Sequence, residues 1–303
     1  MESALIILNQ LIKMAIFCVI GYILHRRNMI SKEGCRAFST LLLYVILPCV
    51  IISSFIRESN TETTWKLLIS FGVSALLVVV SIAISKLLYR KNPVDEFSSS
   101  FSNAGFMGMP LVSAAYGSDA VFYIAGFTAL LNILQWTYGQ RLLSKDKKLS
   151  LKKVILNPLV IALGLGLLVY FLQLRLPIQI QSCITAISAC NSPIAMIILG
   201  YYLSETPFKD IFIFKQGYWV TFGRLIFIPV LSMMLLYLVP GLDVSIKQIM
   251  LIAVCAPVGI NVAIYAQRLE KDYIRAVILI CQSTILCIIT MPIIIWLSTL
   301  LFG

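Results

Sequence analysis

Ten long apolar stretches follow one another along the chain, and no other feature limits its fold so strongly. A membrane-spanning helix needs about 20 consecutive, predominantly apolar residues. Stretches of this kind lie at 3–24, 36–56, 64–88, 96–116, 119–142, 154–173, 178–203, 213–238, 246–267 and 274–301. Because 60% of the residues are hydrophobic and only 12% are charged, lipid is the solvent for most of the chain. The sequence therefore predicts an all-α membrane protein with ten transmembrane helices.

The basic residues predict how these helices are oriented. Of the 24 lysines and arginines, 18 lie in the odd-numbered loops or at their edges, whereas the even-numbered loops hold 4. Cytoplasmic loops carry the excess of positive charge, so we expect a multi-pass protein of the cell (plasma) membrane with both termini outside. Because the bases lie in short loops and form no continuous stripe, the net charge of +11 does not indicate nucleic-acid binding.

The ten stretches divide into two equal halves, residues 1–148 and 149–303. Each half contains five stretches, and an odd number forces the second half to insert upside down relative to the first. Matching features recur, because Pro48 lies in the second stretch and Pro193 in the seventh, while glycine and proline interrupt both the fourth and the ninth. We therefore expect two inverted five-helix repeats.

The fourth stretch contains the segment from Asn103 to Pro110. Gly105 and Gly108 loosen the helix in this segment, and Pro110 cannot donate a hydrogen bond to the carbonyl of Phe106. We expect the helix to break there.

The ninth stretch has a corresponding interruption, in which Pro257 is followed by Gly259 and Asn261. Backbone left unpaired at membrane depth is tolerated where it is buried in protein or lines a wet cavity, and a broken helix presents a positive N-terminal end to an anion. Two facing interruptions would therefore form a small polar site. The alternative is that these residues merely kink two helices. Their matching placement in the two halves favours the site.

Four segments together resemble the auxin efflux carrier family. They are NAGFMGMPL at 103–111, YVILPCVI at 44–51, NPLVIALGLG at 157–166 and STILCIITMPI at 283–293. This family includes plant auxin efflux carriers and bacterial permeases for malate, malonate and related acids. The resemblance implies ten helices in two inverted repeats, with broken helices four and nine crossing at Pro110 and Pro257. Helices 1, 2, 6 and 7 would form a scaffold, and helices 3–5 and 8–10 a mobile transport domain.

The resemblance also implies a substrate site. In the plant members, an asparagine near the crossing and polar residues of helix five contact the substrate carboxylate, and the matching positions here are Asn103, Asn132, Gln135 and Thr137. The plant proteins have a long loop between helices five and six, whereas about residues 144–153 connect them here, which is typical of the compact bacterial type. The implied function is a secondary transporter, a permease or efflux carrier, that moves small organic anions such as carboxylates by alternating access.

Two basic residues lie inside the predicted helices. Lys13 is about 15 Å from either end of its helix, which exceeds the reach of its side chain. A charge at this depth is a functional candidate, so we include Lys13 in the anion site, with a water-filled cleft or a homodimer interface as the open alternatives. Arg224 lies nearer a helix end, close to Pro229, and we expect its long side chain to reach the cytoplasmic headgroups.

Other functions find less support. The stretches hold no acid pair, no buried histidine and no cluster of metal ligands, so we expect neither an enzyme nor a cofactor or metal. Two alternatives stay open: a sodium- or proton-coupled symporter of the related bile-acid or antiporter fold, and a non-transporting membrane receptor. The lack of acids inside the stretches disfavours the symporter, although carbonyls freed at the interruptions, together with Asn103 and Asn261, can hold a sodium ion.

Overall fold

The computed structural model describes residues 2–144 and 155–303, so the expected boundary at residue 148 lies outside the described residues. Within these ranges the chain is helical between short connections, and its only β pairing is an isolated bridge between Ser102 and Val258. Seven helical runs are long and apolar enough to cross a membrane. The prediction of an all-α membrane protein with several spans is confirmed.

The elements follow the order of the predicted stretches. The first half contains α1 (Glu2–Arg26), α2 (Lys32–Leu41), η1 (Leu42–Ile46), α3 (Leu47–Phe55), α4 (Thr61–Tyr89), α5 (Pro93–Ser100), η2 (Ala104–Gly108), α6 (Met109–Tyr116), η3 (Ser118–Ala120), α7 (Val121–Leu134), η4 (Gln135–Gly139) and α8 (Gln140–Leu143). The second half contains α10 (Pro158–Phe171), α11 (Ile178–Ala189), α12 (Asn191–Glu205), α13 (Phe208–Ile213), α14 (Lys215–Phe222), η5 (Gly223–Phe227), α15 (Ile228–Tyr237), α16 (Val244–Cys255), α17 (Asn261–Arg268) and α18 (Tyr273–Phe302).

Three predicted stretches do not form one long helix. The sixth contains α10, which has 14 residues. The fourth is divided into α5 and the continuous run of η2 and α6, and the ninth into α16 and α17. Both of the stretches in which the sequence predicted a break are thus interrupted.

The position of the first break differs from the expectation. The chain leaves helical geometry at residues 101–103, whereas Pro110 is the second residue of α6 and follows the π-helical turn η2 without a break. Pro48 and Pro229 also occupy the second position of a helix that follows a π-helical turn. A π turn carries one extra residue, so it relieves the clash between a proline ring and the preceding turn. Pro110 therefore does not break the helix as expected, because a proline that directly follows a π turn is accommodated within it.

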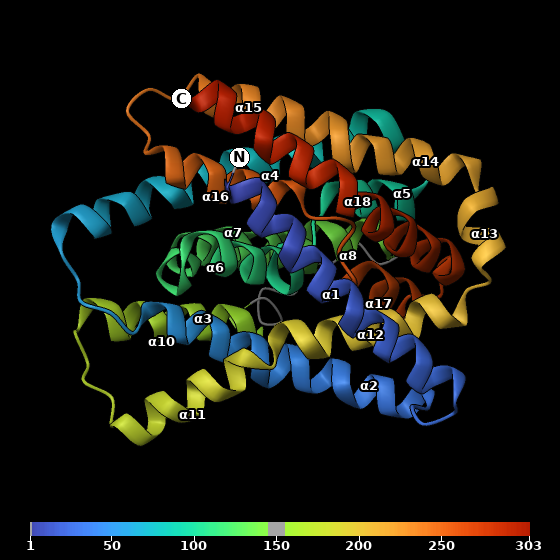
Figure 1. Cartoon of the computed structure of the whole chain (residues 1–303), viewed down its shortest axis with the longest axis horizontal. Coiled ribbons are helices and arrows are strands. Elements are labelled where there is room, and N and C mark those ends of the chain that lie inside the picture. Colours follow the sequence, from blue (N-terminus) through green and yellow to red (C-terminus); the bar gives the residue numbers. More distant parts are fainter. Residues whose placement is uncertain (1, 145–154) are drawn as a thin grey trace.

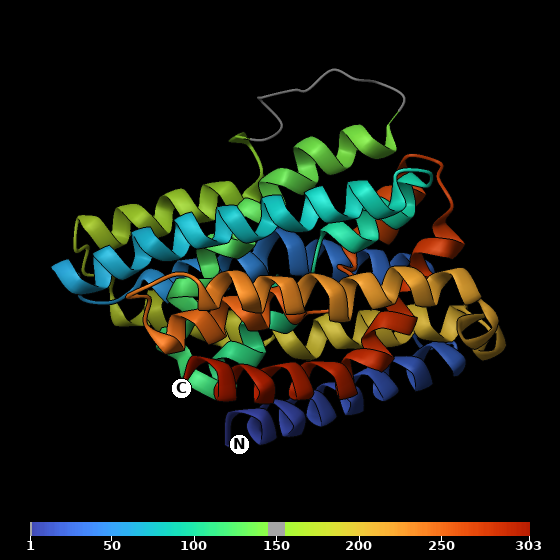
Figure 2. The same ribbon diagram turned by 90° about the horizontal axis from the view of Figure 1, so that it is seen from above.

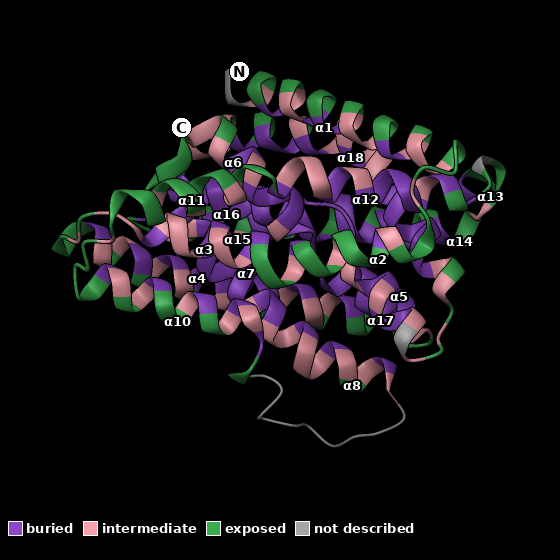
Figure 3. Cartoon of the chain, turned by 90° about the horizontal axis from the view of Figure 1, so that it is seen from below, coloured by how far each residue is buried: buried purple, intermediate pink, exposed green. Residues whose placement is uncertain are grey.

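The interrupted helices lie at the centre of the molecule. Figure 1 shows the helices running lengthwise, with α6 and α7 enclosed by the others. All residues of α16 from Ile246 to Cys255 are buried, whereas α11 has no buried residue. Figure 3 shows the same contrast, with exposed residues on α1, α2 and α10 and buried residues on the central helices. Backbone that lacks helical partners is thus kept away from lipid, as it must be in a bilayer.

The outer helix α1 packs closely against α12. A Cβ atom on Gly200 would lie 2.0 Å from the carbonyl oxygen of Cys18, and one on Gly21 would lie 2.2 Å from that of Ile197. Small residues allow such backbone approach between membrane helices. The same helix contacts α18, and the start of α1 lies near the end of α18 in both views of the ribbon (Figures 1 and 2).

Candidate functional site

The interruptions of the fourth and ninth stretches meet inside the protein. The backbone N–H of Asn103 donates to the carbonyl oxygen of Pro257 at 2.8 Å, and the N–H of Gly259 donates to that of Phe101 at 3.1 Å. These two bonds flank the isolated bridge, so the two interruptions pair as antiparallel strands do. We call this pairing the junction.

Neighbouring helices supply hydrogen-bonding partners to the junction and its surroundings. The N–H of Val258 donates to Oγ of Ser283 on α18 at 3.1 Å. Arg224 on η5 is only 1% exposed, and its guanidinium donates to the carbonyl of Ser99 at 2.8 Å and to the carbonyl of Val254. The expectation that Arg224 reaches the headgroups is wrong, because its side chain turns inward to the last turns of α5 and α16.

Two amide side chains at the junction keep hydrogen-bonding capacity that the protein does not use. Asn103 is 3% exposed, and its Nδ2 has no partner in the described part of the chain. Asn261 donates through Nδ2 to Oε1 of Gln135 at 2.7 Å, while its Oδ1 has no partner within the same ranges. A buried polar atom left unpaired costs about 1–3 kcal/mol. A ligand oxygen that accepts from Asn103 would remove this cost.

A first cavity, of about 490 Å³, borders the N-terminus of α17 and contains Asn261 in its lining. Asn132 on α7 also lines it and donates through Nδ2 to the carbonyl of Thr128 at 2.7 Å. The rings of Trp136 and Tyr265 meet edge to face in its wall, with centroids 5.7 Å apart. Further lining residues are Arg36, Ser39, Thr40, Tyr44, Asn157, Tyr202 and Gln267. The wall thus combines a positive charge, amides and aromatic rings.

A second cavity, of about 570 Å³, borders α6 and contains Pro110 and Asn191 in its lining. Pro110 has no N–H to offer the carbonyl of Gly105, and the N–H of Met109 bonds to Ala104 instead. Nδ2 of Asn191 donates to this carbonyl of Gly105 at 3.1 Å. A side chain from α12 therefore replaces the missing backbone donor.

The two cavities lie near opposite sets of loops. Residues of the first cavity adjoin the first, fifth and ninth loops, which carry most of the basic residues, and residues of the second adjoin the second and fourth loops. Each cavity borders the helix that follows one interruption, α17 in the first case and α6 in the second. The two segments of the junction, residues 101–103 and 257–259, precede these helical runs in the sequence.

Six of the predicted site residues come together at the junction or at the first cavity. They are Asn103, Asn132, Gln135, Pro257, Gly259 and Asn261. Gly105 and Gly108 serve the close packing of η2 on α7, because added Cβ atoms would lie 3.2 Å from Thr128 and 3.3 Å from Ile124 respectively.

The structure does not bring the other predicted residues to this group. Pro110 lines the second cavity. The hydroxyl of Thr137 donates to the carbonyl of Ile133 at 2.8 Å, and Thr137 lines neither cavity. Lys13 lies on the exposed side of α1 and also lines neither cavity.

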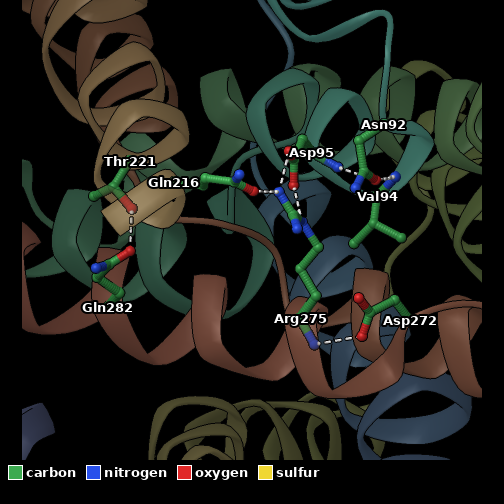
Figure 4. A network of polar contacts seen from close by, with 8 residues as sticks. All are labelled: Asn92, Val94, Asp95, Gln216, Thr221, Asp272, Arg275 and Gln282. Carbon is green, nitrogen blue, oxygen red and sulfur yellow. Dashed lines mark hydrogen bonds and ion pairs between the residues drawn. The ribbon is translucent and has the colours of Figure 1, made fainter. Parts of the chain in front are cut away.

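The half-helix α5 is anchored at its start by an ion pair. Arg275 of α18 donates through Nε to Oδ1 of Asp95 at 2.6 Å and through Nη2 to Oδ2 at 2.7 Å, and it also reaches Gln216 of α14 at 3.2 Å (Figure 4). The side chain of Asn92 caps the first turn of α5 by accepting from the N–H of Val94 at 2.9 Å. A bidentate contact between a guanidinium and a carboxylate fixes the relative orientation of the two side chains in addition to pairing their charges. The half-helix is therefore held to α14 and α18 as one unit.

The whole chain has known relatives. The family model described as "Membrane transport protein" matches residues 6–295. The chain is 23% identical over 312 residues to a protein of Escherichia coli K12 described as the uncharacterized transporter YfdV, and the match covers 97% of this chain and 98% of that relative. The YfdV proteins of Escherichia coli O157:H7 and Shigella flexneri match with the same identity and coverage.

Proposed function

The chain belongs to the membrane transport protein family, the auxin efflux carrier family that its sequence resembles, and from this premise we propose that it moves small organic anions, carboxylates above all, by alternating access. Membership in this family makes it a multi-pass membrane transporter. The substrate class and the transport cycle are our proposal.

One observation carries the proposed substrate class. The amide donor of Asn103 is buried and has no partner among the described residues. Asn103 lines neither cavity, but the junction to which it belongs precedes the helical segments that border the two cavities, α17 and the run of η2 and α6. A hydrogen bond from a neutral donor to an ionised acceptor contributes about 1.5–3 kcal/mol. A carboxylate satisfies this donor, and Arg36 in the first cavity favours entry of a negative charge from that side.

The positions of the cavities support alternating access. The first cavity is bounded by α2, η1 and α10 on one side and by α7, η4 and α17 on the other. The second is bounded by α1, α3, α11 and α12 against α6 and η3. In both cases the proposed scaffold, stretches 1, 2, 6 and 7, faces the proposed transport domain. Movement between these two groups would open one cavity while closing the other.

The junction supports the proposed inverted repeats. Each interruption gives the other one N–H donor and takes one, a reciprocal arrangement that a two-fold relation between the halves would produce. With the basic loops in the cytoplasm, the first cavity would open inward and the second outward, and both termini would lie outside.

Ligand-dependent thermal stability of the purified protein tests the proposed substrate class. A ligand present at about 100 times its Kd stabilises a protein by about 2.7 kcal/mol. We expect mono- or dicarboxylates to raise the melting temperature, and the corresponding amides, which have the same shape without the charge, to leave it unchanged. Equal shifts with acids and amides would contradict an anion site.

A further inference from the structure

Arg224 is a buried cation that the transport site described above does not use. It belongs to the π-helical turn η5, and its side chain is among the largest fully buried ones in the described ranges. No carboxylate oxygen there lies within 4.0 Å of its guanidinium, since the ion pairs found involve Lys66 and Arg275. Its partners are two backbone carbonyls, those of Ser99 and Val254.

Both carbonyls belong to the ends of interrupted helices. Ser99 lies in the last turn of α5 (Pro93–Ser100), and Val254 in the last turn of α16 (Val244–Cys255). The C-terminal end of a helix carries about half a negative charge on its unpaired carbonyls. Two such ends converge on Arg224, so together they present about one negative charge to one guanidinium.

Converging half-helix ends of this kind attract a cation. In secondary transporters, the C-terminal ends of broken helices and unwound carbonyls coordinate the coupling Na⁺. A guanidinium stays charged at every physiological pH, and its planar N–H groups can reach carbonyls on two helices at once. The same two carbonyls therefore have no need of a bound metal ion.

We propose that Arg224 is a permanent internal counter-ion that takes the place of a coupling cation, so that this carrier binds no Na⁺ at its interrupted helices. Arg224 acts here as a positioning residue, because it joins α5 to α16 immediately before the junction. The inference concerns cation binding and rests on the proposed transport function only for the transport measurement described last.

The test compares melting temperatures of the purified full-length protein in sodium chloride and in choline chloride. The wild type should melt at the same temperature in both salts. Arg224→Gln keeps polar donors but loses the charge, so it should melt lower by about 4 °C or more in choline and recover part of the loss in sodium. Arg224→Lys keeps the charge and should be indifferent to sodium, like the wild type.

Chemical rescue provides a second measurement. Arg224→Ala leaves a space with two unpaired carbonyls, so millimolar guanidinium should raise its melting temperature while leaving that of the wild type unchanged. Stabilisation of the wild type by sodium, sodium indifference of Arg224→Gln, or equal effects of guanidinium on Arg224→Ala and the wild type would each overturn the proposal.

Transport of a labelled carboxylate by the wild type should be equally fast with sodium and with choline outside. A rate that depends on sodium would overturn the inference as well. If no carboxylate is transported, the proposed function fails, and the melting temperatures still decide whether Arg224 replaces a cation.

Discussion

The backbone N–H of Asn103 lies 2.8 Å from the carbonyl oxygen of Pro257, so the interruption in each half of the chain is closed by backbone from the other half. The reciprocal bond, from Gly259 to Phe101, measures 3.1 Å. Neither interruption can slide along its own axis without breaking both bonds. We therefore expect α5, α6, α16 and α17 to move together during transport.

Asn103→Ala should weaken carboxylate binding by about tenfold to a hundredfold, because it removes a donor to an ionised acceptor. Stability without ligand should not fall, since Nδ2 of Asn103 has no partner in the described ranges. The Kd can be obtained from the ligand dependence of the melting temperature. Asn103→Asp is the matched control, because it keeps the shape and adds a negative charge, and it should abolish binding. Equal affinities in all three proteins would exclude Asn103 from the site.

Asn191→Ala should destabilise the protein by about 1–3 kcal/mol, because it leaves the carbonyl of Gly105 unpaired. Pro110→Ala supplies a backbone N–H at the position where the proline has none. The cost of Asn191→Ala should therefore be smaller by about 1 kcal/mol in a Pro110→Ala background, as measured by a double-mutant cycle of melting experiments. Additive effects of the two substitutions would contradict the proposed replacement of a backbone donor.

The sequence predicted that the fourth and ninth stretches are interrupted, but it placed the first break at the wrong residue. Glycine and proline mark where a helix is weak, and Pro257 lies in the break itself. Pro110 does not, because the π turn before it absorbs the strain and Asn191 satisfies the freed carbonyl. The second compensation is a tertiary contact with another helix, α12, which the local sequence does not encode.

Gly200→Ala should lower stability by about 1–3 kcal/mol, because the new methyl group would lie 2.0 Å from the carbonyl oxygen of Cys18 and force α1 away from α12. The matched control is Gly164→Ala on α10, where nothing lies within 4 Å of the added atom. This control should be neutral or slightly stabilising, because alanine favours a helix over glycine. Similar melting temperatures for the two variants would contradict the close contact between α1 and α12.

Lys13→Met should leave the ratio of dianion to monoanion transport unchanged, because Lys13 lies on the exposed side of α1 and lines neither cavity. Arg36→Met should lower that ratio, since Arg36 lines the first cavity. Uptake of a malate-like and an acetate-like anion by proteoliposomes measures both effects. A lower ratio in Lys13→Met alone would place Lys13 in the anion path and remove Arg36 from it.

The charges inside the stretches indicate less about the site from the sequence alone than the glycines and prolines do. Depth along a helix can be counted in a sequence, and it marks both Lys13 and Arg224 as unusual. The direction of each side chain depends on which helix face meets a neighbour. Lys13 points away from the protein interior, and Arg224 points to two helix ends that come together only in the folded chain.

Counterflow of a labelled dicarboxylate in proteoliposomes tests the central claim most directly. Vesicles preloaded with the unlabelled acid should accumulate the labelled acid transiently when they contain the wild type, and Asn103→Asp vesicles should not. This result would show carriage across the membrane at the junction. Stabilisation of the wild type by carboxylates without any counterflow would instead indicate a receptor, and it would contradict the proposed transport function.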